Sequence, residues 1–471
     1  MPLQDIETIV VVILENRSFD HALGYLSLPN ADPPLPVDGL QDDPSWLSAR
    51  ANHWNGVSYP PHPIGPAVQN IDDPPHEQST IRVQIQTPPA TAPGMMGGFV
   101  ASYMTRNPPP HDPSLVMGYY TKDAVPIFDF FARNFAVCDH WFAALPTGTQ
   151  PNRLMAMSGE SSILDNAPVF LPRQPLVYDW LTAHRVFWCA YQSGGFFPFF
   201  SLMPHWLPEI TTSLTLSDHG GRGRFRRYSR FHEHWIGNDP MPSVIFIEPE
   251  YTDGPHADPN DDHPPTGIVR GQYFLSDIYR TLVANPNRWA STMMIVTYDE
   301  HGGFFDHVLP LPIPTNVGGY HVDSTGIRVP AFVISPHVEP GTVFTGNLDH
   351  TAILQLLADR FNPGQAYSAS VGARQPYLTR LSAILVPGSG GRLPLPATPD
   401  SAFVSDGTFA GQPVADNLKA PSAAANAMAF RNVALKVAQD HPELLASPGW
   451  QRLATYVAAE STGTNAPTAL A

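Results

Sequence analysis

Cysteine is scarce in this sequence, which has only Cys138 and Cys189 among its 471 residues. Two thiols in so long a chain exclude a scaffold held together by disulfides. Because both cysteines lie among aromatic residues, we interpret them as small buried hydrophobic side chains.

Long hydrophobic runs are also missing. No stretch of about 18 uninterrupted apolar residues occurs, so no transmembrane segment is predicted. The N-terminus lacks a basic region followed by an apolar run and a small-residue cleavage site, and the apolar run at 9–14 ends in charge. We therefore expect no signal peptide in this chain, and either a cytoplasmic protein or one trimmed to its mature form.

Positive charge is in short supply as well. Lys and Arg together number 26 against 42 Asp and Glu, which gives a formal net charge of −16. A field of this sign repels polyanions, so we expect no nucleic acid as a partner. The composition leaves the oligomeric state open.

The apolar residues that are present follow the pattern of an α/β fold. Short β-branched runs at 8–14, 243–247, 292–298 and 328–334 predict buried parallel strands. Between the second and third, the four-residue spacing of Phe274, Ile278 and Leu282 predicts a crossover helix over 271–284. A second helix should begin near Asp349, which can cap it, and run to about residue 361.

The length of the chain fits one main domain, because an open sheet with insertions can reach this size around a single core. We expect a domain over 1–387, with loop-rich insertions near 20–125 and 190–240. Proline, with 53 residues, supports long ordered loops. The segment 388–471 should add a loop, a helix near 422–439 and a disordered tail, packed on the same domain.

The first strand ends in a carboxylate and a carboxamide, Glu15 and Asn16. Side by side at a sheet edge, these groups offer hard oxygen ligands to a cation. Taken alone, the pair reads equally as a solvated strand end followed by a turn.

A second motif is Gly148-Thr149, with Arg153 four positions on. Glycine lets the backbone present the hydroxyl closely, and an arginine fork can meet phosphate oxygens. Thr147 is the rival nucleophile by residue type, and a simple turn capped by Asn152 is the structural alternative.

The third motif, Asp299-Glu300, follows a buried strand and precedes Gly302-Gly303. Adjacent buried carboxylates repel each other unless a cation lies between them, and the glycines allow a close backbone approach to a ligand. This is the most specific local signal in the sequence.

Three separate histidines, His76, His263 and His350, each follow a carboxylate residue within three positions. Imidazoles of this kind can ligate a metal or protonate a leaving alkoxide near neutral pH. Each is also compatible with a plain packing role, since the chain has 19 histidines.

These residues resemble the motifs of a bacterial phosphoesterase family that contains phospholipase C and a group of acid phosphatases, within the alkaline-phosphatase-like superfamily. The similar segments run in the order of the family and cover roughly residues 8 to 361: 15–20, 73–76, 116–120, 135–142, 149–153, 262–264, 298–307, 328–330, 334–336 and 349–351. The resemblance implies an alkaline-phosphatase-like α/β fold, with a central, mainly parallel sheet flanked by helices. Proteins of this family are usually exported.

The resemblance also implies the roles of the site residues. One divalent metal ion would be held by Glu15, Asn16, Thr149, Asp299 and Glu300. The phosphate side would be lined by His76, His263 and His350, where relatives with two metals keep a second ion, so that the number of ions, one or two, stays open. Oxygen ligands allow Ca, Mg or Mn, and the histidines keep Zn among the candidates.

We therefore expect metal-dependent hydrolysis of phosphate esters, with Thr149 as nucleophile and phosphothreonine as intermediate. The resemblance favours a phosphodiesterase of the phospholipase C type, so that phospholipid is a candidate substrate. The alternatives are a broad acid phosphatase and a noncatalytic protein that binds phosphorylated ligands. One departure stands beside the nucleophile, because relatives commonly have proline where this chain has Gly148.

Overall fold

The computed structural model describes residues 2–386 except 66–67, 69–70, 87–94, 167–172, 194–202, 207, 211–212, 214–222 and 252–258. Beyond residue 386 it describes 408–409, 412–413, 439 and 442–446. The helix expected near 422–439 therefore lies almost entirely outside the described residues, and the division of the chain at 387 stays a prediction.

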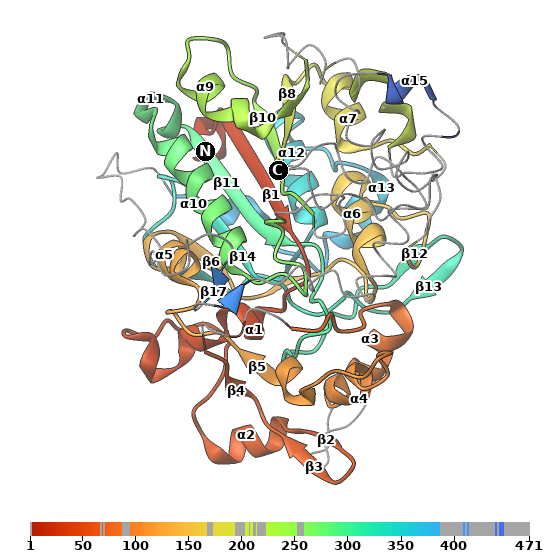
Figure 1. Ribbon diagram of the computed structural model, residues 1–471. Helices are drawn as coiled ribbons and strands as arrows, with labels where there is room; N and C mark the ends of the chain where they lie inside the picture. Colours follow the sequence, from red (N-terminus) through yellow and green to blue (C-terminus); the bar gives the residue numbers. More distant parts are fainter. Residues whose placement is uncertain are drawn as a thin grey trace.

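An eight-stranded sheet runs through the centre of the molecule (Figure 1). Its middle strand, β1 (Thr8–Leu14), pairs in parallel with a neighbour on each side. Across the sheet the order is β15 (Thr342–Phe344), β6 (Ala136–Cys138), β14 (Ala331–Ile334), β11 (Thr292–Tyr298), β1, β10 (Val244–Glu248), β8 (Trp188–Gln192) and β9 (Phe225–Arg227).

The four strands expected from the sequence are all in this sheet, and β1 and β11 have the expected bounds. The expectation that all four are parallel is wrong for β14, which pairs antiparallel with β11. The connection from β11 to β14 contains a small hairpin, β12 (Thr315–Val317) and β13 (Tyr320–Val322), and no helix. Without a crossover helix the chain returns in the opposite direction. An apolar run shows that a strand is buried, not which way it runs.

Four sheet strands were not expected from the sequence: β6, β8, β9 and β15. They are three to five residues long, too short for a clear periodicity. Strand β9 lies inside the range 190–240 that we expected to be an insertion, so part of that range belongs to the sheet.

Helices cover both faces of the sheet (Figure 1). On one face lie α5 (Pro126–Asn134), α9 (Phe231–Ile236), α10 (Val269–Val283) and α11 (Pro286–Trp289). On the other lie α6 (Thr149–Ser158), α7 (Val177–Ala183), α12 (Thr351–Phe361) and α13 (Ala369–Arg374). The two predicted helices are α10 and α12, and the carboxylate of Asp349 accepts the N–H of Thr351 at the start of α12 over 2.8 Å. The α/β fold class is confirmed.

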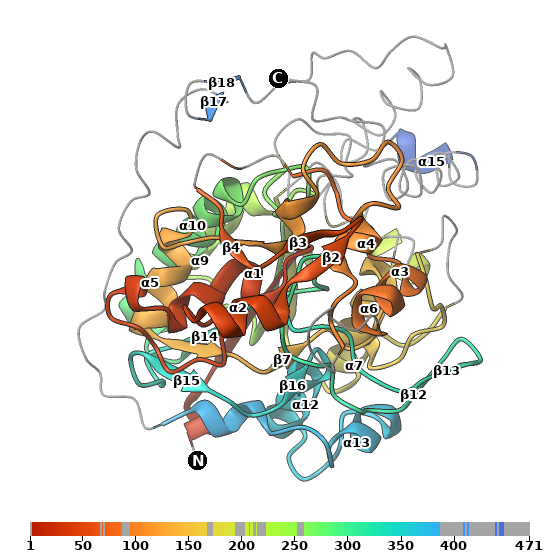
Figure 2. The same cartoon turned by 90° about the horizontal axis from the view of Figure 1, so that it is seen from below.

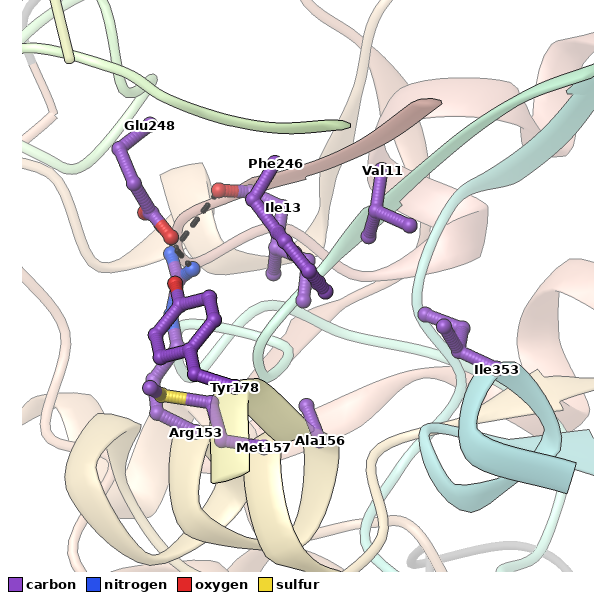
Figure 3. A pocket seen from close by; sticks show the side chains of 9 residues that line it. All are labelled: Val11, Ile13, Arg153, Ala156, Met157, Tyr178, Phe246, Glu248 and Ile353. Atoms are coloured by element: carbon purple, nitrogen blue, oxygen red, sulfur yellow. Dashed lines mark hydrogen bonds and ion pairs between the residues drawn. The ribbon is translucent and has the colours of Figure 1, made fainter. Parts of the chain in front are cut away.

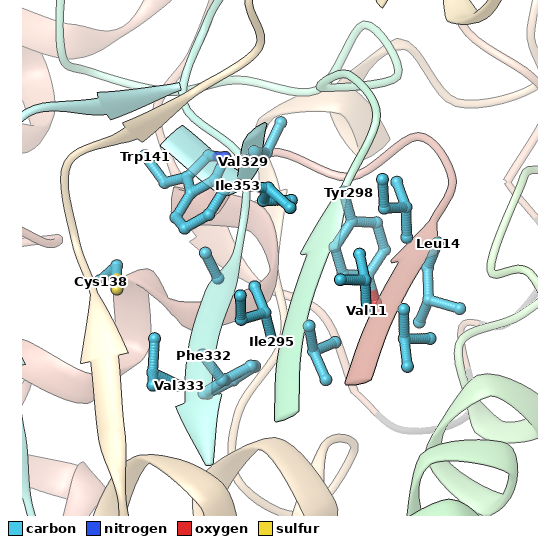
Figure 4. Packing of buried hydrophobic residues seen from close by; sticks show 14 of the residues in the cluster. Val11, Leu14, Cys138, Trp141, Ile295, Tyr298, Val329, Phe332, Val333 and Ile353 are labelled. Atoms are coloured by element: carbon cyan, nitrogen blue, oxygen red, sulfur yellow. The ribbon is translucent and has the colours of Figure 1, made fainter. Parts of the chain in front are cut away.

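Apolar side chains fill the space between sheet and helices (Figure 4). All seven residues of β1 and all seven of β11 are buried, as expected for central strands covered on both faces. Cys138 and Cys189 are buried free thiols, which confirms their interpretation as small hydrophobic side chains. Among the described helices, none has the length and apolar character that crossing a bilayer requires.

The segment between β1 and α5 gathers at one end of the sheet, where β1 and β11 finish (Figures 1 and 2). It consists of short elements joined by loops: α1 (Phe19–Leu23), α2 (Pro44–Arg50), β2 (Asn52–Trp54), β3 (Val57–Tyr59), β4 (His62–Pro63), α3 (Gln78–Gln86), α4 (Phe99–Tyr103) and β5 (Gly118–Tyr119). This segment forms one wall of the site described next.

Candidate functional site

Two residue pairs leave the sheet side by side at the carboxyl end of its central strands. The last residues of β1 and β11 lie opposite each other in the parallel pairing, so Glu15-Asn16 and Asp299-Glu300 follow at the same level. The amide of Asn16 donates to Asp299 Oδ1 over 3.2 Å. All four side chains are at most 3% exposed. The structure thus brings together the four strand-end residues expected to bind a metal.

The backbone at Asn16 is held in a conformation that few residues adopt. Its φ of 63° lies in the left-handed region, which asparagine tolerates better than most side chains. Gly302 packs against it, and a Cβ on Gly302 would lie 2.2 Å from the carbonyl oxygen of Asn16. The glycine expected to allow a close approach therefore allows the approach of one ligand-bearing loop to the other.

Thr149 is the first residue of α6, with Gly148 as its N-cap. Its side chain is 5% exposed, and Oγ1 has no hydrogen-bond partner among the described residues. The φ of −73° at Gly148 is one that every residue, including proline, adopts. Glycine at this position is thus no obstacle to the geometry in which relatives carry proline.

The rival hydroxyl, Thr147, is committed to the loop beside it. Its Oγ1 donates to the carbonyl oxygen of Leu164 and lies 3.0 Å from Asp165 Oδ1. Asn152 is not the helix cap suggested by the sequence, because it lies inside the first turn of α6. Its amide donates to the carbonyls of Thr147 and Gly148 over 2.8 and 3.1 Å and so ties down the approach to the helix.

Arg153 lies in a buried position between α6 and the central strands, with Ile13 and Glu248 beside its guanidinium (Figure 3). It is 2% exposed, and Nη2 donates to the carbonyl of Ile13 over 2.9 Å. Its nitrogens also lie 3.5 Å from Glu15 Oε1, 3.5 Å from Glu248 Oε2 and 3.8 Å from Asp299 Oδ2. Each of these partners is anionic, so the guanidinium acts as an internal counter-charge to the ligand carboxylates.

Four buried oxygens have no hydrogen-bond partner among the described residues: Asn16 Oδ1, Asp299 Oδ2 and Glu300 Oε1 at this edge, and Thr149 Oγ1 on the helix that Arg153 joins to it. Buried polar atoms are ordinarily satisfied, and each exception needs a reason. Carboxylate, carboxamide and hydroxyl oxygens are together the ligands of a hard divalent cation. The residues present therefore fit such an ion.

Burial also makes the negative charge at this edge costly. Burial, together with the neighbouring charge of Glu300, raises the pKa of Asp299 to about 7. A positive ion among these oxygens would lower that pKa again, because it favours the charged carboxylate. The electrostatics point in the same direction as the unsatisfied oxygens.

His76 and His263 lie together beside the four oxygens, with ring centroids 5.8 Å apart. Nε2 of His76 is 3.4 Å from Asn16 Nδ2, which places this histidine against the predicted ligands. Burial lowers the pKa of His76, but Glu300 and Asp73 raise it to about 10. Burial and the charge of His76 lower the pKa of His263 to about 3. The pair thus offers one imidazolium and one neutral imidazole.

His350 also reaches the site, but both of its ring nitrogens are occupied. Nε2 donates to the backbone carbonyl of Asp299 over 2.6 Å, and Nδ1 accepts the indole N–H of Trp141 over 3.3 Å. Burial lowers its pKa to about 4, so the ring is neutral. This arrangement fixes the position of Asp299 and leaves no nitrogen free for a phosphate group.

Within the part of the chain that the structure describes, two clusters of carboxylates and imidazoles have donor atoms close enough to share an ion. One is Asp73, His76 and His263, in which His76 lies against Asn16. The other is Asp20, Asp306 and His307, but Arg328 bonds both of its carboxylates, over 3.1 and 2.9 Å. Because the arginine already supplies the positive charge, the second cluster is a structural ion-pair network.

Sequence reasoning missed three residues of the site. Glu248 stands at the end of β10 and lies beside Arg153, and it carries the signal that identified Glu15, a carboxylate at the end of a buried strand. Asp73 was part of a family-like segment without an assigned role. Gln84 carries no local signal, because its contact with His301 links positions 217 residues apart.

The fold and this site define a phosphoester hydrolase of the α/β class. The chain belongs to the phosphoesterase family, whose family model matches residues 6–363. The resemblance drawn from the motifs is thereby confirmed.

Individual relatives point the same way. Non-specific phospholipase C3 of Arabidopsis thaliana is 31% identical over 383 residues, which cover 76% of this chain and 70% of that protein. Phospholipase C A of Mycobacterium tuberculosis is 28% identical over 416 residues, 76% of this chain and 73% of that protein. This chain spans between 62% and 70% of the length of the plant relatives it matches.

A solved structure from Vibrio parahaemolyticus, described as a protein in the alkaline phosphatase superfamily, is similar over part of the fold. It has a TM-score of 0.30 and 13% identity, and the match covers 50% of this chain and 60% of that one. The overlap is partial, so the family assignment rests on the sequence.

Proposed function

We propose that this protein is a metal-dependent phosphodiesterase of the phospholipase C type, with Thr149 as its nucleophile. The observation that carries the proposal is the hydroxyl of Thr149, which is buried without a hydrogen-bond partner among the described residues. It belongs to the same set as the unsatisfied oxygens of Asn16, Asp299 and Glu300. A buried hydroxyl with no partner is costly unless a ligand satisfies it.

The proposed cation would be held by Glu15, Asn16, Thr149, Asp299 and Glu300. When bound, such an ion favours the alkoxide form of a coordinated hydroxyl and offsets charge on phosphate oxygens. The protein contributes the position of that hydroxyl. Gly148 starts the helix that carries Thr149, and Asn152 holds the preceding loop in place.

The reaction then proceeds in two displacements. Thr149 Oγ attacks phosphorus, the bond from phosphorus to the leaving alcohol oxygen breaks, and an imidazolium gives that oxygen a proton. His76 is the histidine whose surroundings keep it protonated. Water next attacks the phosphothreonine, returns a proton to the histidine and frees Thr149. Two inversions leave the configuration at phosphorus unchanged.

Arg153 supports this chemistry from behind the ligands. Its hydrogen bond to Ile13 and its ion pairs with Glu15 and Asp299 hold the nucleophile helix against the ligand-bearing strand. In the proposal it keeps the carboxylates together and does not contact the phosphate.

The diester specificity rests on the relatives whose names are phospholipases C. Phosphorylcholine diesters and an aryl phosphate monoester, assayed in parallel on the metal-loaded protein, test this part. A higher kcat/KM for the diester supports the proposal, whereas a preference for the monoester points to the acid phosphatase alternative.

The nucleophile is tested by a pair of threonine variants. Thr149→Ala should abolish turnover with the fold intact, while Thr147→Ala should keep turnover and lose stability, because it removes the contacts with Leu164 and Asp165. Mass spectrometry of protein quenched during turnover of a phosphorylcholine diester should find a phosphorylcholine group on the peptide that contains residue 149, because only one of the two ester bonds has been broken at that stage. Turnover by Thr149→Ala at the wild-type rate would sink the mechanism.

A further inference from the structure

Two buried residues outside the proposed ligand set, Gln84 and His301, connect its two sides. Gln84 is 0% exposed and lies on α3, in the segment between β1 and α5. His301 is 1% exposed and directly follows Glu300. Nε2 of His301 and Oε1 of Gln84 are 2.7 Å apart.

The hydrogen bonds around Gln84 determine how its amide is oriented. Nε2 lies 2.9 Å from the carbonyl oxygen of Pro75 and 3.0 Å from Ser102 Oγ. A backbone carbonyl only accepts, so the NH₂ group must face Pro75 and the amide oxygen must face His301. It follows that Nε2 of His301 carries the hydrogen in this contact, since Gln84 Oε1 has none to give.

At the other end, His301 meets the carboxylate of Glu300. Nδ1 of His301 lies 3.3 Å from Oε2, and the amide of Gly302 donates to the same oxygen over 2.7 Å. Oε1 is the oxygen with no hydrogen-bond partner among the described residues. Because Nε2 carries the hydrogen of the neutral ring, Nδ1 has none to donate, so the amide of Gly302 holds Oε2 and the ring of His301 packs against it. Oε1 is left turned toward the proposed cation.

The amide of Gln84 also donates to the carbonyl of Pro75, the residue before His76. Positions 74 and 75 are prolines, which have no backbone N–H, so this stretch is anchored through its carbonyls. The carbonyl of Pro74 is 2.7 Å from Nδ1 of His76, and that of Pro75 accepts from Gln84. Gly303 lets the two sides touch, because a Cβ there would lie 2.8 Å from the Pro75 oxygen.

We propose that Gln84 and His301 are positioning residues that couple the orientation of Glu300 to the placement of His76. The inference rests on the proposed function, because it assigns Glu300 to the cation and His76 to the leaving group. His301 directly follows Glu300, so the bond from its ring to Gln84 restrains the backbone that carries this carboxylate. Losing a residue that supports the ligands of a metal typically costs about 10- to 100-fold in metal affinity or activity. The segment between β1 and α5 thereby contributes directly to the site that it covers.

The test replaces Gln84 by methionine, which keeps the length of the side chain and removes all its hydrogen bonds. The matched control is Asn52→Leu, in the same segment. Asn52 is also 0% exposed, donates to the carbonyl of Met96 and accepts the amide of Phe99, and among the described residues it has no hydrogen bond to Gln84, His301 or the proposed ligands. Both variants should lose stability, so melting temperature reports the loss of a buried amide in each.

Two further readouts separate positioning from stability. The first is the dissociation constant for Mn²⁺, measured on metal-free protein by titration, and the second is kcat against KM. Gln84→Met should weaken Mn²⁺ binding and lower kcat by about 10- to 100-fold, whereas Asn52→Leu should leave both unchanged. Equal losses in the two variants, or no loss in Gln84→Met, overturn the proposal.

A double variant tests whether the two residues act as a unit. The double variant Gln84→Met/His301→Gln should bind Mn²⁺ no more weakly than the more impaired of the two single variants. Either substitution alone already breaks the link between Glu300 and His76. Strictly additive losses contradict the coupling. If the wild-type protein fails to hydrolyse phosphate esters, the proposed function is wrong. The Mn²⁺ dissociation constants of the wild type, the two single variants and the double variant still test whether Gln84 and His301 act together.

Discussion

Nη2 of Arg153 donates a hydrogen bond of 2.9 Å to the carbonyl oxygen of Ile13, which joins the helix of the proposed nucleophile to the strand that ends in Glu15. Arg153 stands one helical turn after Thr149, so the same side chain sets the distance between helix and strand. Its partners include three carboxylates and two backbone carbonyls. The arginine therefore stabilises a site that would otherwise concentrate negative charge.

Replacing Arg153 by methionine should destabilise the metal-free protein by about 3–5 kcal/mol, because it leaves buried carboxylates without their counter-charge. Urea unfolding in the presence of a chelator measures this. Arg153→Lys should recover only part of the loss, since a lysine supplies the charge without the fork that reaches several partners.

The same variant also distinguishes the role of Arg153 from the one expected from its motif. If the arginine bound phosphate, Arg153→Met would raise KM and leave the unfolding free energy of the metal-free protein unchanged. A buried counter-charge predicts instead that Arg153→Met changes the unfolding free energy of the metal-free protein more than it changes KM.

The central strands and their ligand pairs were predictable because the signal is local. Seven consecutive buried residues followed at once by Glu15-Asn16 or Asp299-Glu300 can be read without any knowledge of contacts. The parallel register that places the two pairs opposite each other is a property of the sheet. The sequence predicted the strands but did not determine this register. The direction of β14 depends on its connection, which an apolar run does not encode.

The detailed partners of the site residues were beyond prediction for a physical reason. The hydrogen bonds of His350 with Asp299 and Trp141 connect residues that are 51 and 209 positions apart in the sequence. Such contacts arise only when the sheet and its covering segments have packed. Residue type alone therefore suggested a histidine on the phosphate side, where the structure has one whose ring bonds the backbone carbonyl of Asp299 and the indole of Trp141.

Gly271, on α10, should resist replacement by alanine although it lies inside a helix. Helix propensity alone predicts a gain of about 1 kcal/mol for this change. A Cβ at Gly271 would, however, lie 2.1 Å from Oδ1 of Asp262. That carboxylate also accepts the hydroxyl of Tyr298 over 2.6 Å and precedes His263, so it has little room to move.

We expect Gly271→Ala to lower the unfolding free energy by about 1–3 kcal/mol, the usual cost of overpacking. The displaced Asp262 should also disturb His263 and reduce kcat. Urea unfolding and steady-state kinetics check the two effects. A more stable Gly271→Ala protein with normal kcat would contradict the assigned contact.

Gly148 should behave in the opposite way. Its φ of −73° suits any residue, and a Cβ would meet only the side chain of Asn166, at 3.4 Å. Replacing glycine by alanine where the backbone is compatible stabilises a protein by about 0.4–1 kcal/mol through the unfolded chain. Because Gly148 is an N-cap, a position where alanine is less favourable than glycine, this gain is offset. Gly148→Ala should therefore leave the melting temperature close to that of the wild type with turnover retained, and a loss of turnover would show that Thr149 needs a glycine beside it.

His307 gives the protein a pH-dependent contribution to stability that is separate from the proposed cation site. Its imidazole bonds Asp20 over 2.6 Å and lies 3.1 Å from Asp38, while Arg328 and Asp306 complete the network. Burial lowers the pKa of His307, but the charge of Asp20 and the hydrogen bonds to Asp20 and Asp38 raise it to about 9.

The folded-state pKa of His307 thus lies above the value of about 6.5 expected in the unfolded chain. A raised pKa means that the contribution is fully present below pH 6.5 and is lost as the pH rises through 9. A shift of this size corresponds to roughly 3 kcal/mol. Urea unfolding of the wild-type protein between pH 6 and pH 10 should therefore show a fall in unfolding free energy that His307→Gln lacks.

His321→Gln serves as control, because the side chain of His321 is 59% exposed and its removal should leave the pH profile unchanged. Parallel profiles for wild type and His307→Gln would show that the imidazole does not carry this charge in the folded protein, and that Asp20 depends on Arg328 alone.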